Sequence, residues 1–220
     1  DTCLLAKEVN NDLLHNSRIF HVGSLSLTDE PARGATLAAV KAAKKNGAVI
    51  SYDPNYRASL WSDVETAKTQ MRSLLPYVDL MKLSEDETEL LTDVKEPKEA
   101  AKALSAMGIS YVCVTLGAEG SIACIKNETG VAEPVTVNRV IDTTGAGDAF
   151  WGGFLSAFLE MGGIASELTL EQAIHCAMIG NATASLCIQR RGSLCVMPEK
   201  AEVDALNADI KLNAECCGIL

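Results

Sequence analysis

The sequence of 220 residues has no apolar run near the roughly 18 residues that a membrane-spanning helix needs. It also has no internal repeat and no low-complexity segment, which excludes repeat architectures and a chain that stays disordered. Its composition, 48% hydrophobic and 22% charged, is typical of a soluble globular domain. A chain of this length can bury roughly 70% of the surface that its unfolded form exposes. We therefore expect one α/β domain over residues 1–220 and no membrane partner.

Positive charge is scarce, because 19 Lys and Arg residues stand against 29 Asp and Glu residues, for a net charge of −10. The basic residues are scattered along the chain, whereas proteins that bind a phosphate backbone cluster them. The sequence therefore predicts no nucleic-acid partner. A small anion would need a local positive potential in this acidic protein.

The eight cysteines lack the paired spacing of a zinc site, and most of them lie within apolar segments. We expect them to act as small core residues rather than as metal ligands. No signal peptide is recognisable, since the chain opens at Asp1 without Met or a charged leader. An oxidising compartment is therefore unsupported, and we expect a cytoplasmic location.

Strands and helices are predicted to alternate along the first half of the chain. Apolar, β-branched segments typical of strands lie at 18–24, 48–53, 78–83 and 111–116, and helical patterns at 31–45, 63–75 and 97–108. A short helix is expected to open at Ser84. Segments 121–125 and 131–137, separated by a turn at 127–130, favour an antiparallel pair. The order predicts an α/β fold with a mainly parallel central sheet.

A glycine-rich stretch, Asp142–Phe150 (DTTGAGDAF), precedes an apolar helical pattern. Trp151, Phe154 and Phe158 fall on one helix face, which places Gly145–Asp148 at the helix N-terminus. Unpaired N–H groups there favour an anion, and glycines let it approach the backbone. The plain alternative is a tight turn with an acid that complements the helix dipole. No Gly-Lys-Ser/Thr follows for a P-loop, and the dinucleotide fingerprint wants a small residue where Phe150 stands.

A carboxylate beside a phosphate cradle is unfavourable unless it has a chemical task. Accepting a proton from an attacking hydroxyl is such a task, so Asp148 is the candidate general base.

The stretch Asp142–Phe150 resembles the signature of ribokinase-like sugar kinases. The resemblance implies a three-layer α/β/α fold and ATP-dependent phosphorylation of a sugar. It also implies that the backbone of Gly145, Ala146 and Gly147 forms an anion hole, with Asp148 as the base.

Two further segments resemble the nucleotide site of that family. Val114–Ser121 (VTLGAEGS) is similar to its phosphate loop, which implies that Thr115, Gly117 and Gly120 lie near ATP. An ordinary hairpin turn is the alternative for this segment. The resemblance also assigns Asn181 to the adenine pocket. Arg190–Ser193 (RRGS) resembles the loop beside that pocket, where Gly192 is expected to end a helix.

The metal expectations also come from the resemblance. Lys82–Glu87 (KLSEDE) resembles the Asn-x-x-Glu motif that organises Mg²⁺ through water, with Glu87 matching and Ser84 standing where Asn is usual. Taken alone, these acids would be a solvated helix face. Backbone near Gly192, together with Asp142 and Thr144, is implied as a site for a monovalent cation such as K⁺.

The acceptor expectations rest on Asp53–Trp61 (DPNYRASLW), just past a predicted strand, and on His21–Leu27 (HVGSLSL). Both are similar to fructokinases within the family. Asn55 and Arg57 are then expected to reach the transferred phosphate or the sugar. Fructose is the favoured acceptor, and ribose and 2-keto-3-deoxygluconate remain open.

The resemblance corresponds to the later portion of a ribokinase-like chain, so we expect the first strands and the lid to be missing. This leaves open a nucleotide-binding module without catalysis, a dinucleotide binder that uses Gly145 and Gly147, and a homodimer of the intact protein.

Overall fold

The computed structural model describes residues 2–216, with side chains described through residue 208. Within that range one six-stranded sheet forms the centre of the fold, and its strands are adjacent in chain order. They are β1 (Ile19–Gly23), β2 (Val49–Asp53), β3 (Leu80–Ser84), β4 (Tyr111–Thr115), β5 (Ser121–Ile125) and β6 (Glu128–Ala132). The first four run parallel, and β5 and β6 continue antiparallel. The prediction of a mainly parallel α/β sheet is confirmed.

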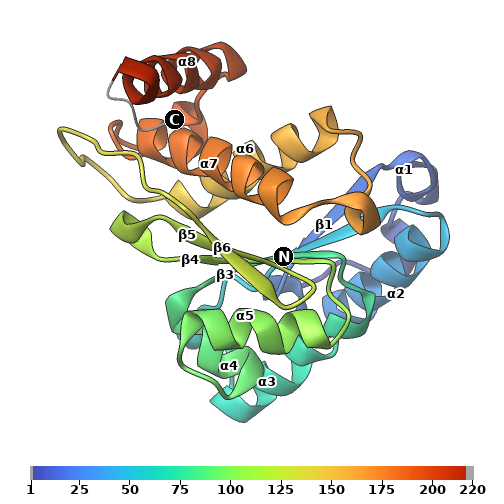
Figure 1. Cartoon of the computed structure of the whole chain (residues 1–220). Helices are drawn as coiled ribbons and strands as arrows, with labels where there is room; N and C mark the ends of the chain where they lie inside the picture. Colours follow the sequence, from blue (N-terminus) through green and yellow to red (C-terminus); the bar gives the residue numbers. More distant parts are fainter. Residues whose placement is uncertain (1, 217–220) are drawn as a thin grey trace.

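Helices cover both faces of this sheet (Figure 1). One face carries α2 (Ala32–Lys45), α3 (Val64–Arg72), α4 (Thr88–Thr92) and α5 (Pro97–Ala106), with the short α1 (Asn11–Asn16) beside α2. The other face carries α6 (Ala146–Glu160) and α7 (Leu170–Cys187), and α8 (Lys200–Cys216) packs on α7. The result is a three-layer α/β/α architecture. Among the helices of residues 2–216, none is long and apolar enough to cross a bilayer.

Aromatic packing holds α6 on the sheet. The ring of Phe154 stacks on Tyr111 of β4 with centroids 4.5 Å apart, and Trp151 stacks on Phe154 at 4.7 Å. Two glycines let α6 and α7 approach each other, since a Cβ at Gly153 would lie 2.3 Å from Oγ1 of Thr183 and one at Gly180 would lie 2.8 Å from the Phe150 carbonyl oxygen. This contact explains a glycine in the interior of α7, where it lowers helix propensity.

The antiparallel pair differs from its prediction in register. The turn is Lys126–Asn127, with φ of 50° and 67°, and not the segment 127–130. Two consecutive residues with positive φ form the two-residue hairpin whose twist matches the strands. β6 therefore begins at Glu128 and ends at Ala132, and the predicted strand at 131–137 is wrong beyond that residue.

Gly192 does not end a helix, contrary to the prediction. α7 ends at Cys187, and the carbonyl of Ile188 accepts the N–H groups of Ile141 and Asp142 at 2.8 and 3.2 Å. The segment before α6 thus donates hydrogen bonds to a carbonyl at the end of α7 that has no partner within the helix. The predicted helices at 63–75 and 97–108 are also shorter than expected, since α3 ends at Arg72 and α5 at Ala106.

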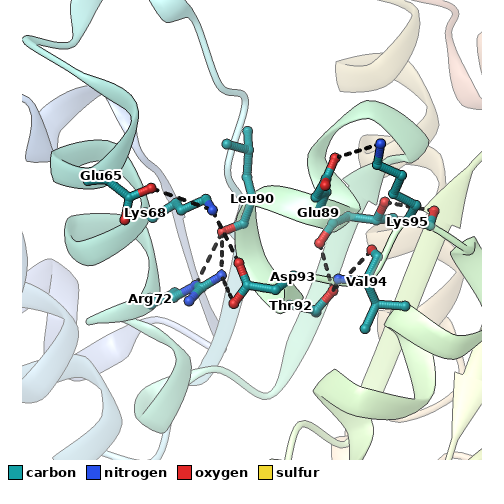
Figure 2. Close-up of polar contacts among 10 residues, drawn as sticks. Glu65, Lys68, Arg72, Glu89, Leu90, Thr92, Asp93, Val94 and Lys95 are labelled. Atoms are coloured by element: carbon teal, nitrogen blue, oxygen red, sulfur yellow. Dashed lines mark hydrogen bonds and ion pairs between the residues drawn. The ribbon is translucent and has the colours of Figure 1, made fainter.

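A polar network ties the end of α4 to α3 (Figure 2). Asp93, in a left-handed conformation with φ of 60°, lies 2.9 Å from Arg72 and 3.1 Å from Lys68. Arg72 also donates to the carbonyl of Leu90 at 2.9 Å. Hydrogen bonds from Arg72 and Lys68 lower the pKa of Asp93. Asp93 follows α4, so the network fixes the C-terminal end of the segment that runs from Glu87 to Asp93.

Candidate active site

The candidate site lies where the carboxyl ends of the parallel strands meet the N-terminus of α6, the edge at which open α/β sheets bind ligands. Gly145 precedes the helix with φ of 81°, and no side chain caps it. The N–H of Ala146 donates to Thr143 at 3.1 Å, whereas those of Gly147 and Asp148 have no acceptor within the helix because they belong to its first turn. Asp148 is exposed there. This geometry can hold an anion beside an exposed carboxylate.

The structural context of a dinucleotide fingerprint is missing. Residues 133–145, between β6 and α6, contain neither strand nor helix. A dinucleotide fold instead leads a strand directly into the glycine-rich turn.

A buried ion pair supports the first turn of α6 from below. Nζ of Lys82 lies 2.8 Å from Oδ2 of Asp53, and the two residues are 7% and 3% exposed. A Cβ built at Gly147 would lie 3.0 Å from the same Nζ. Burial raises the pKa of Asp53, and Lys82 acts against that shift. Sequence reasoning missed this pair, although a lysine inside the apolar strand Leu80–Ser84 was the available signal.

A second polar group links α6 to the neighbouring strands β1 and β2. Nε1 of Trp151 donates to Oγ of the fully buried Ser51 at 2.8 Å, and Nδ1 of His21 lies 3.0 Å from the same Oγ. Desolvation lowers the pKa of His21, while the carboxylates of Asp53 and Asp148 raise it. The sequence predicts only a strand at 48–53 and an apolar helix face for Trp151, and not this hydrogen bond. Polar residues at alternate positions of the buried strand Val49–Asp53 were the signal for this arrangement.

Glu87 lies where the loop after β2 meets the turn after β3. It is 7% exposed, and its Oε1 accepts the N–H of Tyr56 at 2.7 Å. Its Oε2 accepts the N–H and the hydroxyl of Ser84 at 2.8 and 2.9 Å. Glu87 therefore binds the backbone of the loop that contains Asn55, whose N–H donates to Asp53 at 3.1 Å. Arg57 is exposed and donates to the carbonyl of Tyr56.

These residues fit Mg²⁺ only as an ion that arrives with nucleotide phosphates. Both oxygens of Glu87 accept N–H or O–H donors, three hydrogen bonds in all, so few of its lone pairs remain for an ion. Among the described residues no group of three His, Cys, Asp or Glu could hold a metal ion. Mg²⁺ commonly keeps several waters and binds substrate phosphates instead.

The predicted phosphate loop lies at the end of β4. Oγ1 of Thr115 is 3.4 Å from the carbonyl of Leu83, and Gly117, with φ of 59°, is exposed with open space at its Cβ position. Gly120 differs, because it is buried with φ of 86° and its Cβ would lie 2.4 Å from the carbonyl oxygen of Ala132. Gly117 thus faces solvent, whereas Gly120 holds the chain against β6.

Asn181 makes structural hydrogen bonds from α7. Its side-chain amide donates to the carbonyls of Ala132 and Glu133 at 3.0 and 2.9 Å. These bonds fix the chain as it leaves β6, next to the loop of Gly117. They use the amide donors, so the side-chain oxygen is the group left for other partners.

Asp142 joins the two loops at the end of α7. It accepts the N–H of Thr144 at 3.0 Å and that of Gly192, which has φ of 123°, at 3.2 Å. These hydrogen bonds lower the pKa of Asp142. Three of the predicted residues are thus together. The carboxylate retains lone pairs, and with nearby carbonyls it offers the oxygen donors that suit a K⁺ ion.

A cleft of about 660 Å³ runs from Asp148 along α6. Its walls include Gly152 and Ser156 of α6, His175 of α7 and Val203 of α8. Asp148 therefore lines this largely apolar cleft and also lies in the first turn of α6, beside the N–H groups without helical acceptors.

Comparison with known proteins places this geometry in a family. The family model of "pfkB family carbohydrate kinase" matches residues 2–200. Fructokinase-1 of Zea mays is 36% identical over 205 residues, which cover 92% of this chain and 62% of the maize protein. Fructokinase-2 of Solanum habrochaites is 35% identical, with coverages of 92% and 61%. The chain spans 53–64% of the length of such curated relatives.

Solved structures show the same fold. A fructokinase from Vibrio cholerae, crystallised with fructose, ADP and calcium, superposes with a TM-score of 0.82 at 28% identity. The match covers 93% of this chain and 65% of the Vibrio chain. A fructokinase from Xylella fastidiosa with bound ATP reaches a TM-score of 0.84 at 24% identity, covering 96% and 67%. The ribokinase-like fold is confirmed, and the chain belongs to the pfkB family of carbohydrate kinases.

Proposed function

We propose that this chain forms the nucleotide-binding and catalytic part of a kinase that transfers the γ-phosphoryl group of ATP to a sugar hydroxyl. The observation that carries the proposal is the exposed carboxylate of Asp148 in the first turn of α6, beside N–H groups without helical acceptors. The fructokinase names of relatives at about 35% identity favour D-fructose as acceptor and fructose 6-phosphate as product.

The proposed step is an in-line displacement. The sugar oxygen forms a bond to the γ-phosphorus, the bond from that phosphorus to the β,γ-bridging oxygen breaks, and ADP leaves with the electron pair. Asp148 accepts the hydroxyl proton, while the backbone of Gly145, Ala146 and Gly147 stabilises charge on the moving group. Mg²⁺ bound to the nucleotide would neutralise charge on its phosphates.

The remaining residues take supporting roles in this proposal. Asn55 and Arg57 contact the acceptor or the transferred phosphate, and Glu87 orients Mg²⁺-bound water through the loop that it holds. Nucleotide contacts come from Thr115, Gly117, Gly120, Asn181 and Gly192, and K⁺ would lie near Asp142 and Thr144. Arg57 suits phosphate because its planar guanidinium donates charge-assisted hydrogen bonds.

The proposal is tested with Mg-ATP and a panel of fructose, ribose and 2-keto-3-deoxygluconate, following ADP and sugar phosphate. We expect fructose to be phosphorylated fastest, and Asp148→Asn to lose on the order of 10²- to 10⁴-fold in turnover with unchanged nucleotide affinity. Glu171→Gln, which changes an exposed acid of α7, is the control and should keep full turnover. Near-normal turnover in Asp148→Asn would remove the base assignment.

A nucleotide-binding module without catalysis is the second candidate, and the coverage of the relatives favours it. Because the chain spans 53–64% of their length, acceptor contacts can lie in segments that it does not share. ATP binding without phosphorylation of any sugar would support this alternative. We further propose a cytoplasmic location and a homodimer for the intact protein, although a relative from Arabidopsis thaliana is described as chloroplastic.

A further inference from the structure

Lys82 is a buried cation beneath the first turn of α6. Its ammonium is 2.8 Å from Asp53, and it lies so close to Gly147 that a methyl group there would come within 3.0 Å of Nζ. The second residue of α6 thus rests against a cation whose position Asp53 fixes. A side chain at this position would press on the ammonium, so glycine leaves the contact unstrained.

Asp53 extends this contact to the loop after β2. While Oδ2 accepts from Lys82, Oδ1 accepts the N–H of Asn55 at 3.1 Å. Asn55 has a positive φ of 48°, a conformation that needs support from its surroundings. One carboxylate therefore holds the loop of Asn55 with one oxygen and the ammonium beneath α6 with the other.

Stability alone does not account for this pair. Desolvating two charges is costly, and buried ion pairs are often no more stabilising than apolar residues of similar volume. The pair instead connects the Asn55 loop, which follows β2, with the first turn of α6. Its geometry sets their separation.

We propose that Lys82 is a positioning residue that, through Asp53, fixes the distance between the Asn55 loop and the first turn of α6. This inference rests on the proposed function, in which the loop serves the acceptor and the turn serves the phosphoryl group. The pair aligns the two reactants, and alignment dominates phosphoryl transfer because its transition state is loose.

The first test measures amide hydrogen exchange of the 220-residue chain, which requires no turnover. Lys82→Met should increase exchange of the hydrogen-bonded amides of the two segments, Ala146 and Ala149 in one and Asn55 and Tyr56 in the other, by about tenfold or more. Lys44→Met is the matched control, because Lys44 pairs with Asp79 at 2.6 Å away from α6. It should leave both segments unchanged. Unchanged exchange at both segments in Lys82→Met would overturn the proposal.

The second test separates positioning from folding. Lys82→Met alone leaves Asp53 uncompensated and destabilises the fold, whereas Asp53→Asn combined with Lys82→Met removes both charges. We expect the double variant to regain stability in urea, yet to keep the fast exchange and a weakened affinity for Mg-ADP. If the double variant also recovers slow exchange and wild-type affinity for Mg-ADP, the pair has only a structural role.

Kinetics provide the third test. If the wild-type chain phosphorylates a sugar, the double variant should lose kcat about tenfold or more with a smaller change in the KM for sugar. If the double variant loses kcat only to the extent that it is unfolded, Lys82 is not a positioning residue. If the wild-type chain is inactive, the kinase proposal fails for this chain, and the exchange experiment still decides the role of Lys82.

Discussion

Trp151 and Ser51, 100 positions apart in the sequence, are joined by a buried hydrogen bond of 2.8 Å from the indole Nε1 to the serine Oγ. The bond fixes the second turn of α6 over β2, one turn beyond Asp148. The hydrogen bond that holds α6 on the sheet therefore also helps to fix the position of the Asp148 carboxylate.

This link predicts a stability difference between two identical substitutions. Trp151→Phe should lower the free energy of unfolding by about 1–3 kcal/mol more than Trp61→Phe, measured in urea. The reason is that Nε1 of Trp151 has an acceptor, whereas Nε1 of Trp61 is buried with no hydrogen-bond partner among the described residues. Equal losses for the two variants would show that the Ser51 bond contributes nothing.

His21 predicts a pH dependence of stability. Desolvation lowers its pKa below 6.5, against the opposing carboxylates of Asp53 and Asp148. The unfolded chain therefore binds a proton first as the pH falls, so this contribution to stability is present above 6.5 and is lost below it.

Urea unfolding of His21→Gln and wild type at about pH 8 and about pH 5 measures the effect. The variant should gain stability relative to wild type at the lower pH. His15→Gln, at an exposed position of α1, controls for the substitution itself. A constant difference between His21→Gln and wild type would contradict the prediction.

The two glycines of the predicted phosphate loop should respond differently to alanine. Gly120→Ala should cost roughly 2–5 kcal/mol of unfolding free energy, because positive φ is combined with a Cβ 2.4 Å from the Ala132 carbonyl oxygen. Gly117→Ala meets open space and should cost only the conformational strain, about 1–2 kcal/mol. Thermal unfolding ranks the two. A larger loss in Gly117→Ala would refute the packing argument.

Glu87 and Glu85 offer a matched pair within one acidic run. Glu87→Gln replaces an oxygen that accepts N–H or O–H groups with an amide that cannot, which should loosen the Asn55 loop and cost about 1–3 kcal/mol. Glu85→Gln changes an exposed residue and should stay within about 0.5 kcal/mol. The affinity for Mg-ATP should fall only in Glu87→Gln. Similar behaviour of both variants would show that the hydrogen bonds of Glu87 do not stabilise the Asn55 loop.

Local pattern was sufficient for most of the elements. The strand Ser121–Ile125 is as expected, since turn chemistry and apolar periodicity act over a few residues. Element ends were less predictable. The hairpin at Lys126–Asn127 uses residues that carry no glycine signal, and just beyond α7 the carbonyl of Ile188 accepts the N–H groups of Ile141 and Asp142.

The mainly parallel α/β fold, the helix that begins after Gly145 and the candidate carboxylate Asp148 could be predicted, because each depends on neighbours along the chain. The other features of the site arise only in the folded chain. Tertiary structure paired Lys82 with Asp53 beneath Gly147, joined Ser51 to Trp151, and gave Gly120 a packing role. Such contacts depend on strand register and helix approach, which bring distant residues within ångströms and leave no periodic trace in the sequence.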